Sequence, residues 1–407
     1  MKIGSLKSML FGSAITAVIA SCSSVEEVKM GTYAYDAQFL KEHGVEYKEL
    51  VSADGNAKVM VVPAWQGRVM TTSASGDKGD SYGWINYRFI EDGKVNPQFN
   101  PVGGEERFWL GPEGGPFSLY FKKGAEQVYD NWLVPSVIDT EAYEIKAESQ
   151  NSIRFVKEAQ VVNASGTVFN INIDRTVSLM DNAEVSAEYG IELGNRMKIV
   201  AYKSDNKITN IGSEPWTKQK GLVSVWMLGH FNPTPTTTVF IPYNQNAKGR
   251  IVNDEYFGKI PADRLIAENG MLYFKIDGKY RSKLGIPVGR AVGICGSYDS
   301  FKGVLTILSC QLPNDSVSYV NGQWGEQDDP FAGDVINAYN DGPLVDGSIM
   351  GPFYEIETSS PGAELDPGAS LIHTQKVVHI QGDEEELSLI VKKIFGIDLE
   401  VIKTKFQ

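Results

Sequence analysis

The chain has 407 residues and a net charge of −13 at neutral pH. This acidic balance excludes proteins that hold nucleic acid through a large positive surface, and no basic run is present that would bind an anionic polysaccharide. We therefore expect a neutral ligand and no nucleic-acid partner.

The first residues have the features of an export signal that ends at a lipid-modified cysteine. Lys2 and Lys7 provide a basic start, and the apolar stretch that follows is too short to span a bilayer as a helix. The stretch ends in Ile19-Ala20-Ser21-Cys22, which resembles a bacterial lipobox. We expect residues 1–21 to be removed as a signal peptide and Cys22 to carry lipid. An ordinary secretory signal with an incidental cysteine is the alternative.

The residue after Cys22 indicates which membrane holds the anchor. Ser23 stands where an aspartate would resemble an inner-membrane retention signal, so we expect the outer membrane of the cell envelope, with either leaflet possible. No other segment reaches the ~18 apolar residues of a membrane span. Residues 22–34 are expected to form a lipidated tether. Residues 35–407 contain no linker, charge block or repeat and are expected to form a single domain.

Extended segments dominate the chain from residue 57 onward. Apolar and polar residues alternate in Thr167–Leu179 and again in Ala183–Leu193, with a turn between them. Half-buried antiparallel strands have this pattern because successive side chains point to opposite faces of a sheet. Further strands are predicted at Ala57–Val62, Ile153–Ala159, Val223–Trp226, Thr237–Ile241, Met271–Ile276, Ala291–Ser297, Gly303–Leu312 and Val377–Ile380.

Two helices are predicted. One is Tyr35–Glu42. The other is Asp383–Phe395, with Asp383 as cap, Glu386 as its capping-box partner and Gly396 at the end. One face of the second helix carries an apolar stripe that is expected to pack on the sheet, with partner binding as the alternative: Leu387, Ile390, Val391 and Ile394. A chain this rich in strands must bury two apolar faces and protect its sheet edges, which predicts an all-β sandwich or barrel.

Cys295 and Cys310 are expected to be free thiols. They lie on the arms of a predicted hairpin that turns near residues 299–302, where Cys295 would face Thr306. Cys310 would then lie roughly 13 Å farther along its strand. A disulfide requires Cα atoms within about 7 Å.

Neither a metal nor an organic cofactor is predicted. Four histidines and the lack of a CxxC motif give no support for zinc. The acidic turns at 328–334 and 340–343 carry oxygen ligands that calcium prefers, but their spacing is not that of an EF-hand, and ordinary turns use the same residues. Gly103-Gly104 lacks the Lys-Ser/Thr of a phosphate loop.

The segment Phe353–Ala363 places two carboxylates on one side of a predicted strand. Glu355 and Glu357 share a face because strand side chains alternate. A carboxylate pair on a rigid strand can serve as acid and base, and if both are buried and close, mutual repulsion raises one pKa. The alternative is a polar, solvent-facing side of the strand.

Several phrases, in this order, resemble the galactose mutarotase-like superfamily. The last of these phrases, within Glu355 to Gly368, resembles the superfamily's E-T-x-x-P strand and the L-x-P-G turn that follows it. The phrases are Val61 to Val69 (VVPAWQGRV), Tyr82 to Asn86 (YGWIN), Gly103 to Gly115 (GGEERFWLGPEGG), Ser224-Val225-Trp226 with Val239 to Pro242 (VFIP), and Glu355 to Gly368. The resemblance covers most of residues 55–380. It implies an all-β fold, a β-supersandwich with few helices, whose concave sheet binds a sugar ring.

The resemblance also implies roles for three residues. In the catalytic aldose 1-epimerases of the superfamily, a glutamate takes the proton of the anomeric hydroxyl and a histidine gives one to the ring oxygen. By position Glu357 is the implied base, with Glu355 as second candidate. The phrase Leu228-Gly229-His230-Phe231-Asn232 is similar to the superfamily's His-aromatic-Phe-Asn phrase but shorter, and it implies His230 as the acid. A surface-loop histidine is the alternative.

Five further residues are candidates for binding a sugar. Arg107, Trp109 and Glu113 lie in a glycine-rich segment, and an aromatic ring can stack on the C–H face of a sugar while charged groups bind its hydroxyls. Trp84 and Asn86 belong to the aromatic–Asn phrase. The alternative is a structural pair of Arg107 and Glu113 beneath Trp109.

Three functions are compatible with the sequence. The favoured one is an envelope lipoprotein that binds a neutral carbohydrate in the concave site, with or without processing it. The second is an aldose 1-epimerase with a glutamate base and a histidine acid. The third is a non-catalytic surface lipoprotein that docks an unknown protein partner. Fold alone does not choose among them, because function resides in the site.

Overall fold

The computed structural model of the chain describes residues 28–313 and 317–407. The expected signal peptide, Cys22 and the first residues of the expected tether lie outside this part of the chain. Helix α1, Tyr33–Glu42, begins two residues before the predicted position because the hydroxyl of Thr32 caps it, accepting a hydrogen bond from the Tyr35 amide. No helix within the described ranges is both long and apolar enough to cross a membrane.

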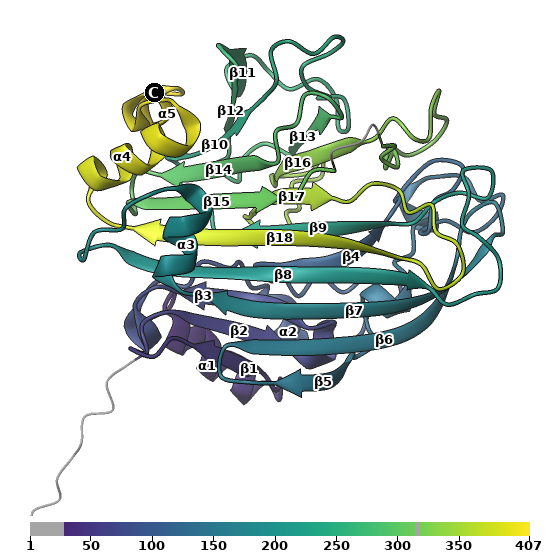
Figure 1. The fold of residues 1–407 in the computed structure, drawn as a ribbon, viewed down its shortest axis with the longest axis horizontal. Coiled ribbons are helices and arrows are strands. Elements are labelled where there is room, and N and C mark those ends of the chain that lie inside the picture. The colour runs from purple at the N-terminus through teal and green to yellow at the C-terminus, as the bar shows by residue number, and fades with distance from the viewer. Residues whose placement is uncertain (1–27, 314–316) are drawn as a thin grey trace, which may run out of the picture.

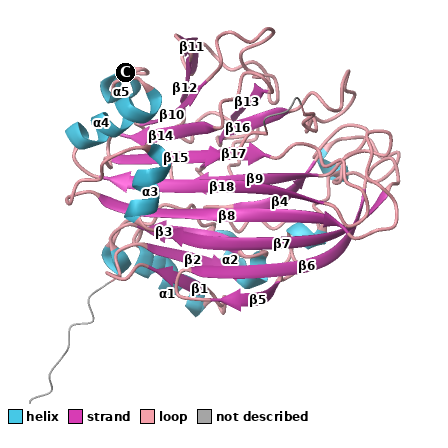
Figure 2. Cartoon of the chain, in the orientation of Figure 1, coloured by secondary structure: helices cyan, strands magenta, loops and turns pink. Residues whose placement is uncertain are grey.

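Three antiparallel sheets form the body of the molecule (Figures 1 and 2). The large sheet has ten strands, in the spatial order β11 (Leu265–Glu268), β12 (Met271–Lys275), β10 (Thr237–Pro242), β14 (Ile294–Asp299), β15 (Val304–Cys310), β18 (Ser370–Gln381), β8 (Lys198–Asn210), β7 (Val168–Met180), β6 (Ser152–Val162) and β5 (Glu144–Glu148). A five-stranded sheet has the order β13 (Ser282–Pro287), β16 (Asp334–Asn340), β17 (Tyr354–Ser359), β9 (Ser224–Phe231) and β4 (Arg107–Gly111). The smallest sheet has the order β1 (Lys48–Val51), β2 (Lys58–Val62) and β3 (Arg68–Ser73).

The five-stranded and large sheets pack face to face around the main hydrophobic core. Ile336 and Ile356 of the smaller layer belong to the same fully buried cluster as Ile173 and Val377 of the larger one. Each strand gives alternate side chains to this core, as period-two patterning requires. The prediction of an all-β sandwich with few helices is therefore confirmed.

Helices α3 (Asn182–Tyr189), α4 (Glu384–Phe395) and α5 (Leu399–Thr404) pack on the outer face of the large sheet, toward one end of its strands (Figure 2). In α4, Asp383 caps the helix by accepting from the Glu385 amide, and Gly396 ends it at a φ of 73°. Glu386 is not the capping partner, since its carboxylate binds Arg196 at 3.1 Å. The predicted packing of the α4 stripe is confirmed for Leu387, Ile390 and Val391, which are buried. Helix α2 (Tyr87–Asp92) joins α1 in a cluster with the three-stranded sheet.

One predicted strand is wrong, because most of Ala183–Leu193 belongs to α3. The Asp181 carboxylate accepts from the Glu184 amide and the Glu184 carboxylate accepts from the Asp181 amide, both at 2.8 Å. Gly190 then ends the helix in a left-handed conformation. Residues four apart, such as Val185 and Tyr189, share a face in a strand and in a helix alike. Local capping therefore decides the conformation here.

Several predicted strands differ in extent, and some strands had no predicted counterpart. Strand β9 continues past Trp226 to Phe231, so His230 lies inside a strand rather than in a surface loop. Strand β4 forms within the glycine-rich segment, and the 13-residue β8 lies at the centre of the large sheet. The hairpin of β14 and β15 pairs Cys295 with Leu308 rather than Thr306, and both cysteines are free thiols, as predicted.

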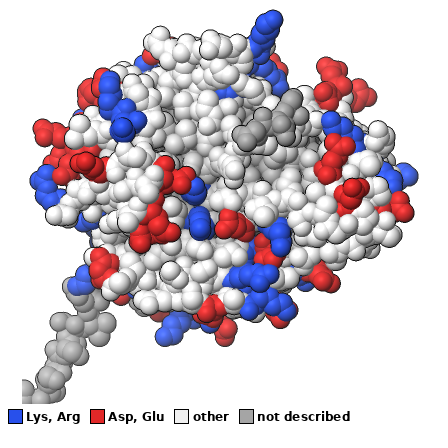
Figure 3. All heavy atoms as spheres, viewed as in Figure 1, with Lys and Arg blue, Asp and Glu red and all other residues white. Residues whose placement is uncertain are grey.

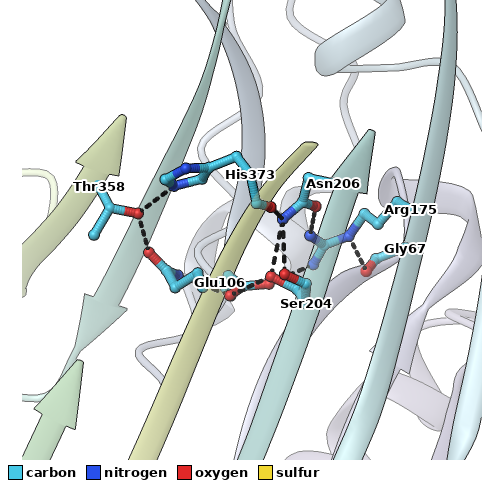
Figure 4. A network of polar contacts seen from close by, with 8 residues as sticks. Gly67, Glu106, Arg175, Ser204, Asn206, Thr358 and His373 are labelled. Carbon is cyan, nitrogen blue, oxygen red and sulfur yellow. Dashed lines mark hydrogen bonds and ion pairs between the residues drawn. The ribbon is translucent and has the colours of Figure 1, made fainter. Parts of the chain in front are cut away.

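A network of buried polar groups crosses the interior of the sandwich (Figure 4). Arg175 on β7 donates to one oxygen of Glu106 at 2.6 Å, and both side chains are fully buried. Ser204 and Gln375 donate to the other oxygen at 3.0 and 2.7 Å. The side-chain carbonyl of Gln375 accepts from the Thr358 hydroxyl on β17 at 2.7 Å. These bonds connect β17 to the large sheet through polar groups that satisfy one another.

The exposed side of the large sheet carries charges of both signs. In Figure 3, acidic and basic side chains are interspersed on this face, and neither sign forms a continuous patch across it. Several of them form surface ion pairs, such as Arg154 with Asp174 at 2.7 Å and Lys376 with Glu188.

Candidate functional site

The outer face of the five-stranded sheet gathers polar and aromatic side chains. Glu355 is paired across the ladder with His230 on β9 and with Tyr339 on β16. Residues paired across antiparallel strands share a face. Thr358, next to Glu357, points into the interior network, so the two glutamates point away from the large sheet. These side chains define the site face: Arg107, Trp109, Trp226, Leu228, His230, Lys283, Asn337, Tyr339, Glu355 and Glu357.

Glu355 and His230 form the central pair of the site face. Glu355 Oε1 lies 2.7 Å from His230 Nε2 and 3.8 Å from a nitrogen of Arg107. His230 Nδ1 lies 3.1 Å from the carbonyl oxygen of Gly104, which can only accept, so Nδ1 carries a proton. Both nitrogens of the imidazole are therefore engaged by the protein.

The charge state of this pair follows from its burial. Glu355 is 7% exposed, and burial raises its pKa, against the opposing effect of Arg107. Burial, together with the charge of Arg107, lowers the pKa of His230 well below its usual range. Both shifts act against the charged forms of the two groups.

Glu357 is held by two neighbours and is fully buried. Its Oε2 accepts from the indole N–H of Trp226 at 2.7 Å and from the ammonium of Lys283 at 3.0 Å. Oε1 lies 3.0 Å from the same ammonium but takes part in no hydrogen bond. Burial raises the pKa of Glu357 to about 7; the charge of Lys283 opposes this shift and that of Glu355 adds to it. A solvent-facing strand side is thus excluded for both glutamates.

A small cavity lies beside Trp226 and Lys283, the two residues that hold Glu357. Its polar walls come from Glu113, which follows β4, from Lys283 on β13 and from Asp334 on β16, while Tyr256 and Trp226 supply rings. Burial raises the pKa of Glu113 to about 7, an effect that Lys283 opposes. The carboxyl groups of Glu113 and Glu357 thus share one lysine as their neighbouring cation.

Aromatic rings surround the cationic groups of the site face. The Arg107 guanidinium lies 4.0 Å from the centre of the Trp109 ring, and Trp109 meets Trp226 edge to face at 5.5 Å. The Lys283 ammonium lies 4.9 Å from the Trp226 ring. The alternative expectation for Arg107 was a structural pair with Glu113. Arg107 on β4 instead pairs with Glu355 on β17, two strands away in the same sheet.

The remaining two predicted residues occupy the edge of this region. The Trp84 ring packs on Phe353 at 4.5 Å, near His230, and its amide donates to the His230 carbonyl. Asn86 has a structural role, because its side-chain oxygen accepts from the Phe89 amide and caps α2. The structure therefore brings Glu355, Glu357, His230, Arg107 and Trp109 together, with Glu113 at the adjoining cavity and Asn86 apart from them.

Sequence reasoning missed Lys283, Tyr256 and Asp334. Lys283 alternates with Leu284 and Ile286, which are buried, so its position resembles an exposed strand residue. Asp334 lies in an acidic segment that resembles a turn. Trp226 was available as a signal, because a tryptophan at the start of an apolar strand can supply a buried donor to a carboxylate.

In the described part of the chain, His, Cys, Asp and Glu side chains form no group of three that could hold a metal ion. The acidic turns at 328–334 and 340–343 have other contacts. Asp329 accepts from the Phe331 amide, and Asp341 accepts from the Gly351 amide and the Tyr339 hydroxyl.

Comparison with known proteins agrees with the architecture. The pattern of DUF6786, described as a family of unknown function, matches residues 31–406. A galactose mutarotase-like protein from Lactobacillus casei superposes with a TM-score of 0.50 and 11% identity, over 82% of this chain and 100% of that one. The Slr1438 protein from Synechocystis gives 0.51 and 12%, over 83% and 96%. No curated protein matches the sequence. The fold is the galactose mutarotase-like sandwich that the sequence phrases predicted.

Proposed function

The chain belongs to the family of unknown function DUF6786, and we propose that it binds a neutral carbohydrate at the site face and interconverts its anomers. The observation that carries this proposal is the state of Glu357. Its Oε2 accepts from Trp226 and Lys283, its Oε1 lies 3.0 Å from the same ammonium without a hydrogen bond, and burial raises the pKa of the group to about 7. A base of this kind can take a proton from an anomeric hydroxyl at neutral pH.

The charges of the site support a neutral ligand. Lys283 is the neighbouring cation of both Glu357 and Glu113, and Arg107 and His230 lie against Glu355. A ligand with its own charge would add an unpaired charge to a buried set, which is costly. The ring of Trp226 lines the cavity and offers a stacking surface for the C–H groups of a sugar.

A ligand screen tests binding. We expect neutral aldoses to raise the melting temperature of the residue 23–407 chain and to change its tryptophan fluorescence, while uronic acids have little effect. At a hundredfold excess over Kd, binding adds about 2.7 kcal/mol to the free energy of unfolding. Trp226→Phe should weaken binding, whereas Trp216→Phe, which alters a ring packed on Phe169, is the matched control. Equal responses to neutral and acidic sugars, or no response to any sugar, contradict the proposal.

We further propose that the mature protein is held at the cell envelope, at the outer membrane, by lipid on Cys22. The support is the sequence Ile19-Ala20-Ser21-Cys22 after a basic and apolar start. The full-length chain is expected to partition into the detergent phase after extraction of the expressing cells, and Cys22→Ala to move it to the aqueous phase. An unchanged distribution of the variant would contradict lipidation at Cys22.

A further inference from the structure

We infer, on the premise of the proposed function, that Glu113 is the second proton-transfer group of this site. It would act with Glu357, and His230 would serve to position Glu355 instead of donating a proton. Three observations carry the inference: the engagement of His230, the place of Glu113 in the cavity wall, and an unpartnered carboxylate oxygen on Asp334 at the same cavity.

His230 has no free nitrogen for a ligand. Its Nδ1 donates to Gly104, and its Nε2 lies 2.7 Å from Glu355. The ring is packed between Trp84 and Phe353, at 6.0 and 4.9 Å between ring centres. The side chain is 5% exposed and, like that of Glu357, is not in the wall of the cavity that Glu113 and Lys283 line. Proton transfer from His230 to a ligand would first require the Glu355 contact to break.

Glu113, in contrast, lies in the wall of that cavity. The segment after β4 is fixed on both sides of it: the Pro112 carbonyl accepts from the Leu119 amide at 3.0 Å, and the Glu113 carbonyl accepts from the Ser118 hydroxyl. The carboxyl faces Lys283, Trp132 and Trp324, which favour its ionised form against burial. A carboxyl so placed can change its protonation state near neutral pH.

Asp334 shows that the cavity offers an unfilled polar contact. Its Oδ2 accepts from Tyr256 at 2.7 Å and from Asn253 at 3.0 Å, while Oδ1 is buried without a hydrogen-bond partner. Asp334 is 6% exposed and lines the cavity beside Glu113. The position of the Asp334 side chain requires glycine at position 285, because a Cβ there would lie 2.1 Å from Oδ2. A ligand hydroxyl that enters this cavity could donate to Oδ1 and would satisfy this group beside Glu113.

The proposed step balances in protons and electrons. Glu357 takes the proton of the anomeric hydroxyl, whose oxygen becomes the carbonyl oxygen of the open-chain aldehyde. The bond between the anomeric carbon and the ring oxygen breaks, and its electron pair stays on the ring oxygen, which takes the proton of Glu113. After rotation about the neighbouring carbon–carbon bond, closure returns both protons. The step needs neither an oxidant nor a further reactant.

This pairing predicts a bell-shaped pH dependence, since the base must be ionised and the acid protonated. The macroscopic pKa values belong to the pair, because the two carboxyls and Lys283 interact. The other titratable or charged groups that interact with these two carboxyls are Arg107, Tyr120, His230, Tyr256 and Glu355.

The test compares Glu113→Gln, Glu357→Gln and His230→Asn with the wild type in the residue 23–407 chain. Exchange between anomers of neutral aldoses is measured by NMR, and affinity is measured by fluorescence titration. Glu113→Gln is expected to lower the rate constant about 10²–10⁴-fold at nearly unchanged affinity, and to remove the fall in rate at alkaline pH. His230→Asn should keep that alkaline limb.

Each outcome has one meaning. A Glu113→Gln rate within about threefold of the wild type, beside an inactive Glu357→Gln, overturns the inference and leaves the proposed function standing. A His230→Asn variant that alone loses the alkaline limb assigns the acid to His230 and also overturns it. Sugar binding without exchange in the wild type removes both proton-transfer roles. An absence of sugar binding removes the proposed function itself.

Discussion

Replacement of Glu357 by glutamine is expected to lower the rate of anomer exchange about 10²–10⁴-fold, which is the usual contribution of a general base. Glutamine has nearly the same shape as glutamate, and its carbonyl oxygen can still accept from Trp226 and Lys283. The amide cannot take a proton from a hydroxyl at neutral pH. The melting temperature should therefore change far less than the rate, which polarimetry of a freshly dissolved aldose would measure.

The pH profile gives an independent check on the same residue. Because burial raises the pKa of Glu357 to about 7, the carboxylate is lost as pH falls below that value. The wild-type rate should consequently decline on the acidic side of about pH 7, and this acidic limb should be absent from the residual rate of Glu357→Gln. Glu148→Gln, at an exposed ion pair with Lys48, is the matched control. A variant with the wild-type rate would remove Glu357 from the mechanism.

Replacement of Arg175 by methionine is expected to lower the free energy of unfolding by ~3–5 kcal/mol, the usual cost of removing one partner of a buried ion pair. Glu106 would lose a bond of 2.6 Å inside the sandwich and remain fully buried without its cationic partner. Urea denaturation followed by circular dichroism would measure the change.

Arg154→Met provides the comparison, since Arg154 is half exposed and pairs with Asp174 on the same sheet. Its effect should stay below about 1 kcal/mol, as for other surface pairs. Adding Glu106→Gln to Arg175→Met should recover part of the loss, because the stranded charge is then gone. Equal effects of Arg175→Met and Arg154→Met would show that the interior pair contributes no more than a surface contact.

Periodicity in the sequence predicted the parts of the fold where one face is apolar. Strands β7, β10 and β12 were found in this way, as was the stripe of α4. Periodicity failed at α3, because residues four apart lie on one face in a strand and in a helix alike. The capping residues Asp181 and Gly190 determine that this segment is a helix. Periodicity also missed β8, and it ended one predicted strand at Trp226, whereas β9 continues through His230 to Phe231.

The site was predictable where it resides on one strand and not where several strands meet. Alternation placed Glu355 and Glu357 on one side of β17, and their register with β9 brings His230 beside Glu355. Lys283 comes from β13, which is joined to β17 only through β16. The sequence alone does not show that the cation beside Glu357 comes from β13, which is distant in the chain. The strand order decides it.

The residues around the cavity come from two kinds of backbone, paired strands and connecting segments. This difference affects how related proteins can diversify. Asn337 in the cavity wall and the neighbouring Glu357 lie on β16 and β17, which are paired on both sides, whereas Glu113, Val320, Gly322 and Tyr256 come from connecting segments. Insertions and substitutions are tolerated in connections far more readily than in the middle of a sheet. Under the proposed function, descendants of one ancestor could therefore change the ligand they accept by remodelling these segments while they inherit Glu357 on β17 unchanged.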